Sequence, residues 1–289
     1  MTSIDNNIVH AGRPSRTALH VATLRAAHQI LDEPIVFDDP LAMKLLDPDT
    51  RSRLLDDPFQ YNDPLSRGER ASLVVRSKFA EDEVSRAVAA GVRQYVVLGA
   101  GLDTFAYRNP YEAMGLRVYE VDHPATQRSK KKCLEQAGIP APGNLIFVPV
   151  DFEQEALMEC LCAVGFREEQ PACISWMGVT VYLSEEAIFR LLSVVAHLPR
   201  GSSVFFDYHV PKIMLDSVQQ AIVEVMKQKV AAFGEPWITT FEPTSLREQC
   251  LALGFREAEN YDSNELNKRY LFRRKDGLRS GGRILVART

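Results

Sequence analysis

The sequence is poor in cysteine and has no spacing of cysteine or histidine that would hold a metal. Its five cysteines are scattered and odd in number, which is typical of free thiols in a reducing compartment rather than of a disulfide framework. Cys160 and Cys162 do not form a C-x-x-C pair, and no second pair follows them. The histidines lack H-E-x-x-H spacing, so each is expected to be an ordinary surface or core residue. We therefore expect no metal.

Long apolar runs and an excess of basic residues are also absent. Residues 1–9 contain Asp5 and two asparagines instead of the apolar core of a signal peptide, and no window approaches the ~20 apolar residues of a membrane span. The formal net charge of -4 gives no reason to expect nucleic acid, which is bound by clustered Lys and Arg. We expect a cytoplasmic protein, not bound to a membrane, whose partner is a small molecule. No pattern indicates its oligomeric state.

With 289 residues and no internal repeat, the chain is expected to form a single domain with additions. Residues 1–90 are predicted to form an N-terminal helical cap. Within it, a stripe of apolar residues at helical spacing runs from Leu19 to Leu31, and a longer helix is expected from about residue 69 to residue 90. Asp39-Pro40 and Asp63-Pro64 resemble N-cap and first-turn proline pairs.

From Gln94 onward, short apolar runs alternate with helical stretches, which predicts a mostly parallel sheet with right-handed crossovers. Residues 91–210 and 251–289 would form this core. Residues 211–250 are predicted to be a helical insertion whose apolar stripe faces the core, with a part in covering the site left open. The last two strands are expected to be antiparallel, with no helix between them. The predicted strands are residues 95–98, 116–121, 145–150, 172–176, 203–206, 255–261 and 283–287.

A glycine turn follows the first of these strands and indicates the kind of ligand. Gly99 and Gly101 allow a sharp turn and a close approach of the backbone to a ligand. The third glycine of a G-x-G-x-x-G dinucleotide motif is replaced by Thr104, which disfavours a diphosphate. Asp103 would repel a diphosphate but suits a cation or hydroxyl and amino groups. S-adenosylmethionine offers an ammonium, a sulfonium and a ribose diol, with no phosphate.

An acid at the end of the second strand is the candidate ribose ligand. Asp122 lies twenty-three positions after Gly99 (122 minus 99), close to the ~20-residue offset of a ribose-binding carboxylate. Glu120 lies on the same side of the strand, but Asp122 is nearer to the carboxyl end, where ligands bind. Alone, either acid would more simply cap the helix that begins after Pro124. Together with the glycine turn, the ribose role is the better interpretation.

Five blocks of the sequence stand in a distinctive order and spacing. They are Arg76-Ser-Lys-Phe-Ala-Glu-Asp82, Leu98-Gly-Ala-Gly-Leu-Asp-Thr104, Tyr119-Glu-Val-Asp-His-Pro124, Val150-Asp-Phe152 and Ser175-Trp-Met-Gly-Val-Thr-Val-Tyr-Leu183. Together they resemble the S-adenosylmethionine-dependent methyltransferases of the leucine carboxyl methyltransferase type, in particular their bacterial small-molecule O-methyltransferases. The resemblance runs from about Ser15 to the C-terminus. It implies an α/β fold with a class I methyltransferase, Rossmann-like sheet, mostly parallel with an antiparallel C-terminal strand, and an N-terminal helical lid.

The resemblance also implies a role for individual residues. Arg76 would hold the methionine carboxylate, a task that suits the bidentate guanidinium, although an ion pair with Glu81 or Asp82 is the alternative. Asp151 and Phe152 would meet the adenine, and Asp151 could also cap the next helix. The remaining residues implied to contact S-adenosylmethionine, or its product S-adenosylhomocysteine, are Gly99, Ala100, Gly101, Asp103 and Asp122.

The fourth strand's block departs from the eukaryotic members of the family. Met177 stands where they have a glutamate, and a thioether accepts only weak hydrogen bonds from an ammonium. The role in binding the ammonium would pass to the Met177 carbonyl, or Met177 would simply pack beneath the cofactor. Thr180 and Tyr182 follow on the same loop and could face the transferred methyl group or the acceptor.

Methyl transfer from a sulfonium requires an acceptor oxygen held about 3 to 3.5 Å from the methyl carbon more than it requires an acid or a base. A carboxylate acceptor is already nucleophilic and needs only a cation to hold it. A phenol or alcohol would need a general base, for which His209 and Tyr182 are candidates. The candidate cations are Arg16, Arg25, Arg269 and Arg273, although a place on a solvated helix face is the simpler interpretation of each.

Two other classes of function stay open at this point. A nicotinamide oxidoreductase of the Rossmann type would need the third glycine that Thr104 replaces. A non-catalytic interaction protein would bind the cofactor without turnover. The favoured function is an S-adenosylmethionine-dependent O-methyltransferase acting on a carboxylate or hydroxyl of a small molecule.

Overall fold

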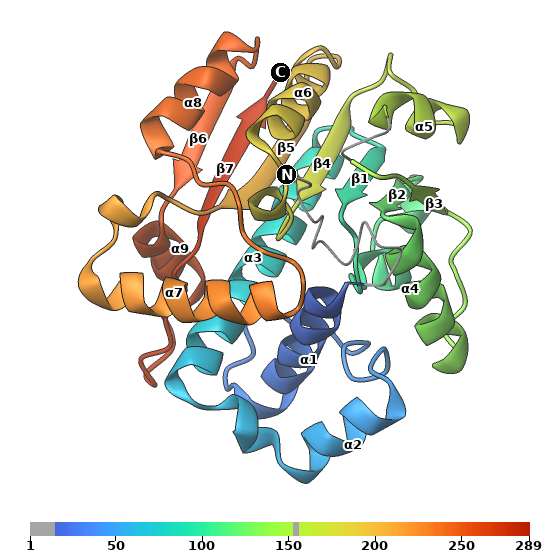
Figure 1. Ribbon diagram of the computed structural model, residues 1–289. Helices are drawn as coiled ribbons and strands as arrows, with labels where there is room; N and C mark the ends of the chain where they lie inside the picture. Colours follow the sequence, from blue (N-terminus) through green and yellow to red (C-terminus); the bar gives the residue numbers. More distant parts are fainter. Residues whose placement is uncertain (1–14, 153–155) are drawn as a thin grey trace, which may run out of the picture.

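A computed structural model describes residues 15–152 and 156–289 and contains one seven-stranded sheet in the order β3-β2-β1-β4-β5-β7-β6 (Figure 1). The five strands β1 to β5 are parallel, and β7 runs antiparallel to both of its neighbours. The predicted mostly parallel α/β fold with an antiparallel end is therefore confirmed. The strands are β1 (Gln94–Leu98), β2 (Arg117–Asp122), β3 (Leu145–Pro149), β4 (Ala172–Trp176), β5 (Ser203–Tyr208), β6 (Glu257–Tyr261) and β7 (Arg283–Arg288).

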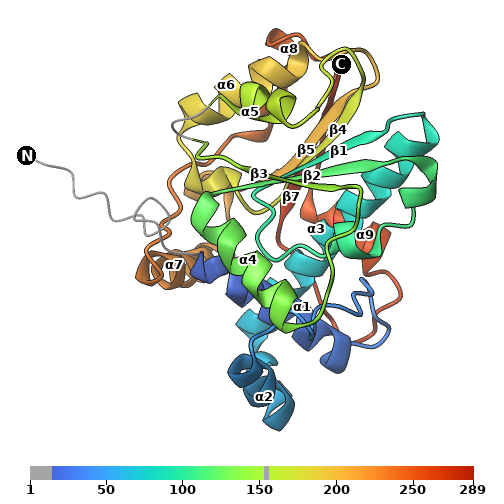
Figure 2. The same ribbon diagram turned by 90° about the vertical axis from the view of Figure 1, so that its right-hand side faces the viewer.

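Helices cover both faces of the sheet, which explains why the central strands are mostly apolar and are buried along their whole length. Every residue of β1 and β4 is buried. One face packs against α5 (Leu157–Ala163), α6 (Glu185–Ala196) and α8 (Pro243–Ala252). The other packs against α3 (Pro64–Ala89) and α9 (Ser263–Tyr270), and α4 (Pro124–Gln136) lies beside β3 (Figure 2). A parallel sheet buried on both faces is the arrangement that such continuous apolar runs predict.

The predicted cap contains α1 (Arg16–Leu31), α2 (Pro48–Asp56) and α3. A face of small residues on α1, including Ala22 and Ala26, packs against Leu46 and Leu54. Helix α3 starts at Pro64, earlier than predicted, because the Asp63 side chain caps the amides of its first turn. Its apolar side packs on the sheet, so α3 belongs to the core as well as to the cap.

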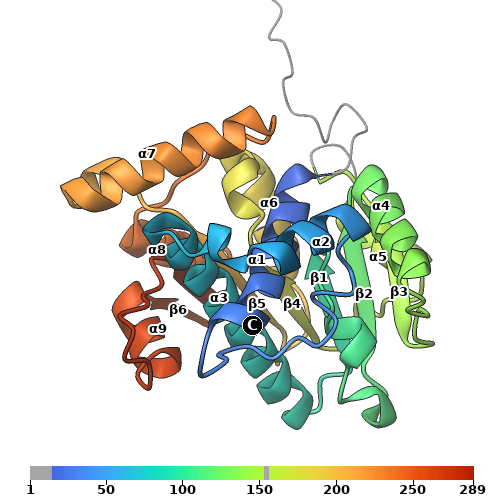
Figure 3. The ribbon, with the colours of Figure 1, turned by 90° about the horizontal axis from the view of Figure 1, so that it is seen from below.

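The insertion contains α7 (Ser217–Ala232), and the expectation that its apolar stripe faces the core is wrong. Val218, Ile222 and Val225 are 67%, 46% and 50% exposed, whereas Met226 and Val230 are buried. Val218, Ile222, Met226 and Val230 follow one another at i, i+4 spacing along one side of the helix, and only the end of that side with Met226 and Val230 is buried against the rest of the protein. Seen from below, α7 crosses the molecule at its edge, beside the cap (Figure 3).

Two local predictions also need correction. Asp39-Pro40 opens a turn rather than a helix. The Asp39 carboxylate accepts the amide hydrogen of Leu41 and also pairs with the buried guanidinium of Arg25. Helix α9 lies between the last two strands, where none was expected. Within the described residues, no helix combines the length and apolar character that crossing a membrane requires.

Candidate active site

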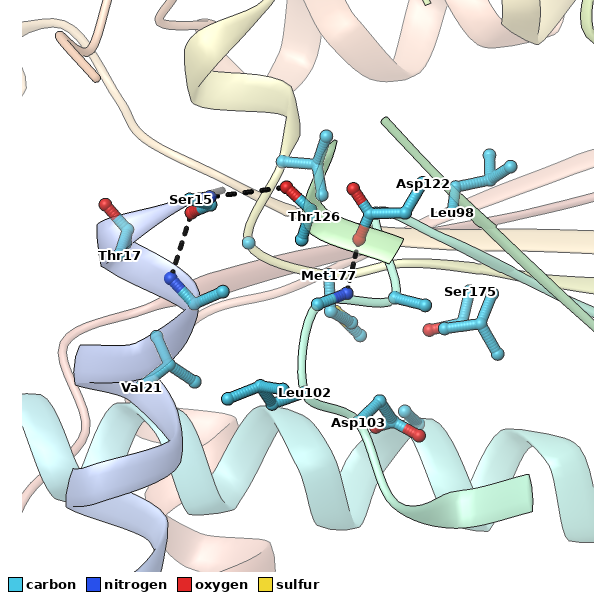
Figure 4. A pocket seen from close by; sticks show the side chains of 18 of the residues that line it. Ser15, Thr17, Val21, Leu98, Leu102, Asp103, Asp122, Thr126, Ser175 and Met177 are labelled. Atoms are coloured by element: carbon cyan, nitrogen blue, oxygen red, sulfur yellow. Dashed lines mark hydrogen bonds between the residues drawn. The ribbon is translucent and has the colours of Figure 1, made fainter. Parts of the chain in front are cut away.

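A cavity of about 220 Å³ lies at the carboxyl ends of the parallel strands, between the sheet and the cap helices α1 and α3. This is the crevice where open α/β sheets bind ligands. Figure 4 shows Val21 of α1 pointing across it toward Leu102, with Asp122 at the edge of the sheet. All nine residues predicted to contact the cofactor line this one cavity: Arg76, Gly99, Ala100, Gly101, Asp103, Asp122, Asp151, Phe152 and Met177.

The glycine turn has the left-handed backbone that only glycine adopts without strain. Gly99 and Gly101 have φ values of 65° and 46°. A Cβ atom on Gly99 would lie 2.2 Å from Cγ2 of Val179, so the turn also needs the space that glycine leaves. The turn is followed by the short 3-10 helix η2 (Phe105–Arg108). No α-helix therefore begins here to direct its N-terminus at a diphosphate.

Asp122 lies at the end of β2, where its carboxylate is held against the glycine turn. Its Oδ2 accepts the amide hydrogen of Gly101 at 2.5 Å, and its Oδ1 accepts that of His123 at 2.7 Å. Burial raises the pKa of Asp122 to about 6, although these two hydrogen bonds lower it. Glu120 is instead buried outside the cavity, 2.7 Å from Lys130 Nζ. The choice of Asp122 over Glu120 agrees with this geometry.

Arg76 extends from α3 and lines the cavity. Its Nη1 lies 3.0 Å from Oδ2 of Asp207, so neither Glu81 nor Asp82 is the partner that the alternative interpretation named. Glu81 pairs with Arg108. The guanidinium also lies against Gly178, where a Cβ atom would come within 2.6 Å of Nη2.

Three of the other predicted cofactor residues come from loops that follow strands. Asp103 accepts the amide hydrogen of Phe105 at 2.8 Å through one oxygen and borders the cavity. Phe152 borders the cavity and also packs against the core. Met177 also borders the cavity, and it packs against the core on the opposite face of the sheet. The structure therefore shows the packing contact that was suggested for it.

The two candidate catalytic residues have different surroundings. Tyr182 lines the cavity, and burial raises its pKa to about 12, so it is a neutral hydrogen-bond donor at neutral pH. His209 does not line the cavity; its ring packs edge-on against Trp237 with centroids 4.2 Å apart. Burial lowers the pKa of His209 to about 4. The structure therefore brings Tyr182, but not His209, to the cavity.

Most of the predicted substrate residues lie elsewhere. Arg25 lines the cavity, but its Nε is 2.9 Å from the fully buried Asp39. Thr180 is buried and donates a hydrogen bond of 2.6 Å to the Asp207 carbonyl. The remaining three do not border the cavity: Arg16 lies over the Phe233 ring, Arg269 pairs with Asp82, and Arg273 lies over the Phe272 ring.

Two acids were missed by the sequence analysis. Glu235, from the insertion, lines the cavity and is only 5% exposed. It accepts hydrogen bonds from Ser15 Oγ and the Arg16 amide, both at 2.7 Å, and so caps α1. Asp207 is the last residue but one of β5 and pairs with Arg76. Its position at a strand's carboxyl end was a usable signal, whereas Glu235 had none, because its partners lie far away in the sequence. Among residues 15–152 and 156–289, no three metal-ligating side chains gather.

The comparison with known proteins settles the family. The family described as leucine carboxyl methyltransferase matches residues 18–196, more than half of the chain. The chain belongs to the leucine carboxyl methyltransferase family. It is an S-adenosylmethionine-dependent methyltransferase, as the resemblance of its five blocks implied.

Several relatives of this methyltransferase carry the same description. YktD of Bacillus subtilis, named as an S-adenosyl-L-methionine-dependent methyltransferase, is 32% identical over 91% of this chain and 93% of its own length. A Frankia alni protein of that description is 34% identical over 65% of each chain. Among solved structures, a methyltransferase of Thermobifida fusca superposes with a TM-score of 0.58 at 18% identity, covering 97% of both chains. That likeness supports the class I fold alone.

Proposed function

We propose that this methyltransferase transfers a methyl group to an oxygen atom, carboxylate or hydroxyl, of a small molecule. The observation that carries the proposal is the convergence of the glycine turn, Asp122 and Arg76 on one cavity beneath the helical cap. A carboxylate and a guanidinium that line the same cavity suit a nucleoside joined to an amino acid. The free thiols of all five cysteines agree with a cytoplasmic setting.

The residues present fit S-adenosylmethionine. Asp122 would accept hydrogen bonds from the ribose hydroxyls, and Arg76 would hold the methionine carboxylate. Asp151 and Phe152 would meet the adenine. Asp103 borders the cavity with a carboxylate that suits the ammonium, since the Met177 side chain accepts only weakly. When bound, the cofactor supplies an electrophilic methyl group on its sulfonium.

The chain's own contribution is positioning and exclusion of water. Ala18, Val21 and Ala22 of α1 form an apolar wall over the cavity, held in place because Glu235 caps that helix. The Tyr182 hydroxyl is neutral and can donate a hydrogen bond to the acceptor oxygen. A carboxylate acceptor needs no base, because it is already ionised at neutral pH.

Mass spectrometry of a methylation assay with a panel of carboxylic acids and phenols tests the proposal. We expect a mass gain of one methylene on an acceptor of either class, with formation of S-adenosylhomocysteine. Calorimetry should show binding of S-adenosylhomocysteine and none of NADH. Preference for NADH, or methylation only of nitrogen, would contradict the proposal.

A further inference from the structure

Asp207 of β5 contacts both α3 and the loop after β4, two segments that line the cavity through Arg76 and Gly178. Its Oδ2 lies 3.0 Å from Nη1 of Arg76 on α3. Its Oδ1 accepts the amide hydrogen of Gly178, which directly follows Met177 after β4. Its main-chain carbonyl accepts the hydroxyl hydrogen of Thr180 at 2.6 Å. One residue at the end of β5 therefore connects α3 to the loop that borders the cavity.

These contacts place the Arg76 guanidinium before any ligand arrives. Nη1 is held by Asp207, and Nη2 lies against the bare Cα of Gly178, which Asp207 fixes through the amide. The Arg76 side chain is 22% exposed and lines the cavity, so its remaining N–H groups are available to an anion. A long side chain that is already ordered loses less conformational freedom when it binds a carboxylate.

We propose that Asp207 is a positioning residue for the cofactor: it presets Arg76, and with it the loop at Gly178, to receive the α-carboxylate of the methionine moiety. The inference rests on the proposed function, because it requires Arg76 to bind that carboxylate. It goes further because it gives a role to an acid that is not among the residues proposed to contact the ribose or the adenine. Asp207 does not line the cavity, so it acts through Arg76.

The test compares two ligands that differ only in the part that Arg76 would bind. S-adenosylhomocysteine carries the amino acid, whereas 5′-methylthioadenosine keeps the adenosine and the sulfur without it. Calorimetry on Asp207→Ala should show about tenfold weaker binding of S-adenosylhomocysteine, as expected for loss of a charge-assisted contact. Binding of 5′-methylthioadenosine should stay within about twofold. Asp207→Asn, whose amide oxygen can still accept from Gly178, should lose less.

A double-mutant cycle shows whether the effect passes through Arg76. In an Arg76→Ala background, Asp207→Ala should cause no further loss of S-adenosylhomocysteine affinity. Asp82→Asn is the matched control. Asp82 lies on α3, as Arg76 does, and its Oδ2 is 3.1 Å from Nη2 of another arginine, Arg269. The affinity for both ligands should stay unchanged in this variant.

Each other outcome has a distinct meaning. Equal weakening of both ligands by Asp207→Ala and Asp207→Asn would mean that Asp207 merely supports the fold, and no weakening would mean that Arg76 positions itself; either result overturns the inference. If Asp207→Ala fails to fold, Asp207→Asn decides the matter. Failure of the unmodified protein to bind either ligand would instead overturn the proposed function.

Discussion

At the scale of single residues, Asp122 is the acid on which the ribose assignment depends. It already accepts two main-chain hydrogen bonds and borders the cavity. Asp122→Ala should weaken S-adenosylhomocysteine binding by roughly 1.5 to 3 kcal/mol, the usual contribution of a charge-assisted hydrogen bond. Calorimetry on the variant measures this directly. Unchanged affinity would show that the ribose assignment is wrong.

The raised pKa of Asp122 predicts that cofactor affinity depends on pH. Ribose hydroxyls donate to the ionised carboxylate, so binding lowers a pKa that is about 6 in the free protein. Affinity should therefore fall about tenfold per pH unit below pH 6, where binding releases a proton, and should not depend on this group above pH 6. Without ligand the sign reverses: because the folded-state pKa is raised, this group makes the protein less stable as pH rises from about 4 to 6.

Calorimetry of S-adenosylhomocysteine binding from pH 5 to pH 8 checks this dependence. Glu120, whose pKa burial raises to about 7, lies near Asp122 together with its partner Lys130, and the Glu235 carboxylate lines the same cavity and also interacts with Asp122. Asp122→Ala separates these contributions, because its affinity should lose the pH dependence. A variant that keeps the full slope would assign the titration to another group.

Gly99 should not tolerate a side chain. A Cβ atom there would lie 2.2 Å from Cγ2 of Val179, on a residue whose φ is 65°. Gly99→Ala should cost about 2 to 4 kcal/mol of unfolding free energy, from overpacking and the left-handed backbone together. Denaturant unfolding measures the loss. Adding Val179→Ala should recover only the overpacking part, whereas Gly68→Ala, in open space within α3, should not destabilise.

At the scale of elements, the insertion acts on the cavity through one carboxylate. Glu235 accepts from the Arg16 and Thr17 amides at 2.7 Å and 3.2 Å and caps α1 from outside. Glu235→Ala should cost about 1 to 2 kcal/mol in local stability of α1. Hydrogen exchange in residues 16–31 should become faster and cofactor binding weaker. Glu224→Gln, on the exposed side of α7, should change neither.

The central strands were predictable because each is a short, mostly apolar run that is buried on both faces, as β1 and β4 show. Helix α7 was found by its spacing, but the exposure of its first turns was not, since Val218 and Ile222 continue the side that is buried at Met226 and only tertiary contacts decide how much of that side is covered. Helix α9 was missed although Asp262 and Glu265 form a capping box, because Leu266 is its one buried residue. The capping residues that begin the helix could be read from the sequence, but a single buried residue gives no apolar periodicity.

The site likewise contains residues that local sequence predicts and residues that it does not. The glycine turn and Asp122 follow from a local pattern, because a strand, a turn and a second strand fix their relative positions. Glu235 could not be predicted, since it meets Arg16 across 219 positions. The role of Arg25 changed for a similar reason: Asp39, a buried acid expected only to cap a helix, neutralises it.

At the scale of the whole molecule, buried ion pairs connect the cap to the core, and we expect them to couple the unfolding of the two. The buried Asp32, which follows α1, pairs with Arg70 of α3 at 2.6 Å and with Arg274, beyond α9, at 3.2 Å. Removing one partner from such a buried group leaves an uncompensated charge. The cap and the sheet should therefore unfold in one transition, in agreement with the single-domain organisation we propose.

A thermal scan with and without S-adenosylhomocysteine tests this coupling. A ligand at about a hundred times its Kd stabilises the folded state by about 2.7 kcal/mol, which for a chain of this size raises the Tm by roughly 5 °C. Because the cavity is bounded by α1, α3 and the sheet, the ligand should shift the whole transition. Two transitions, of which only one responds to the ligand, would show that cap and core are separate units. Asp122→Ala should keep the single transition but lose most of the shift, since it removes a ligand contact and none that joins cap to core.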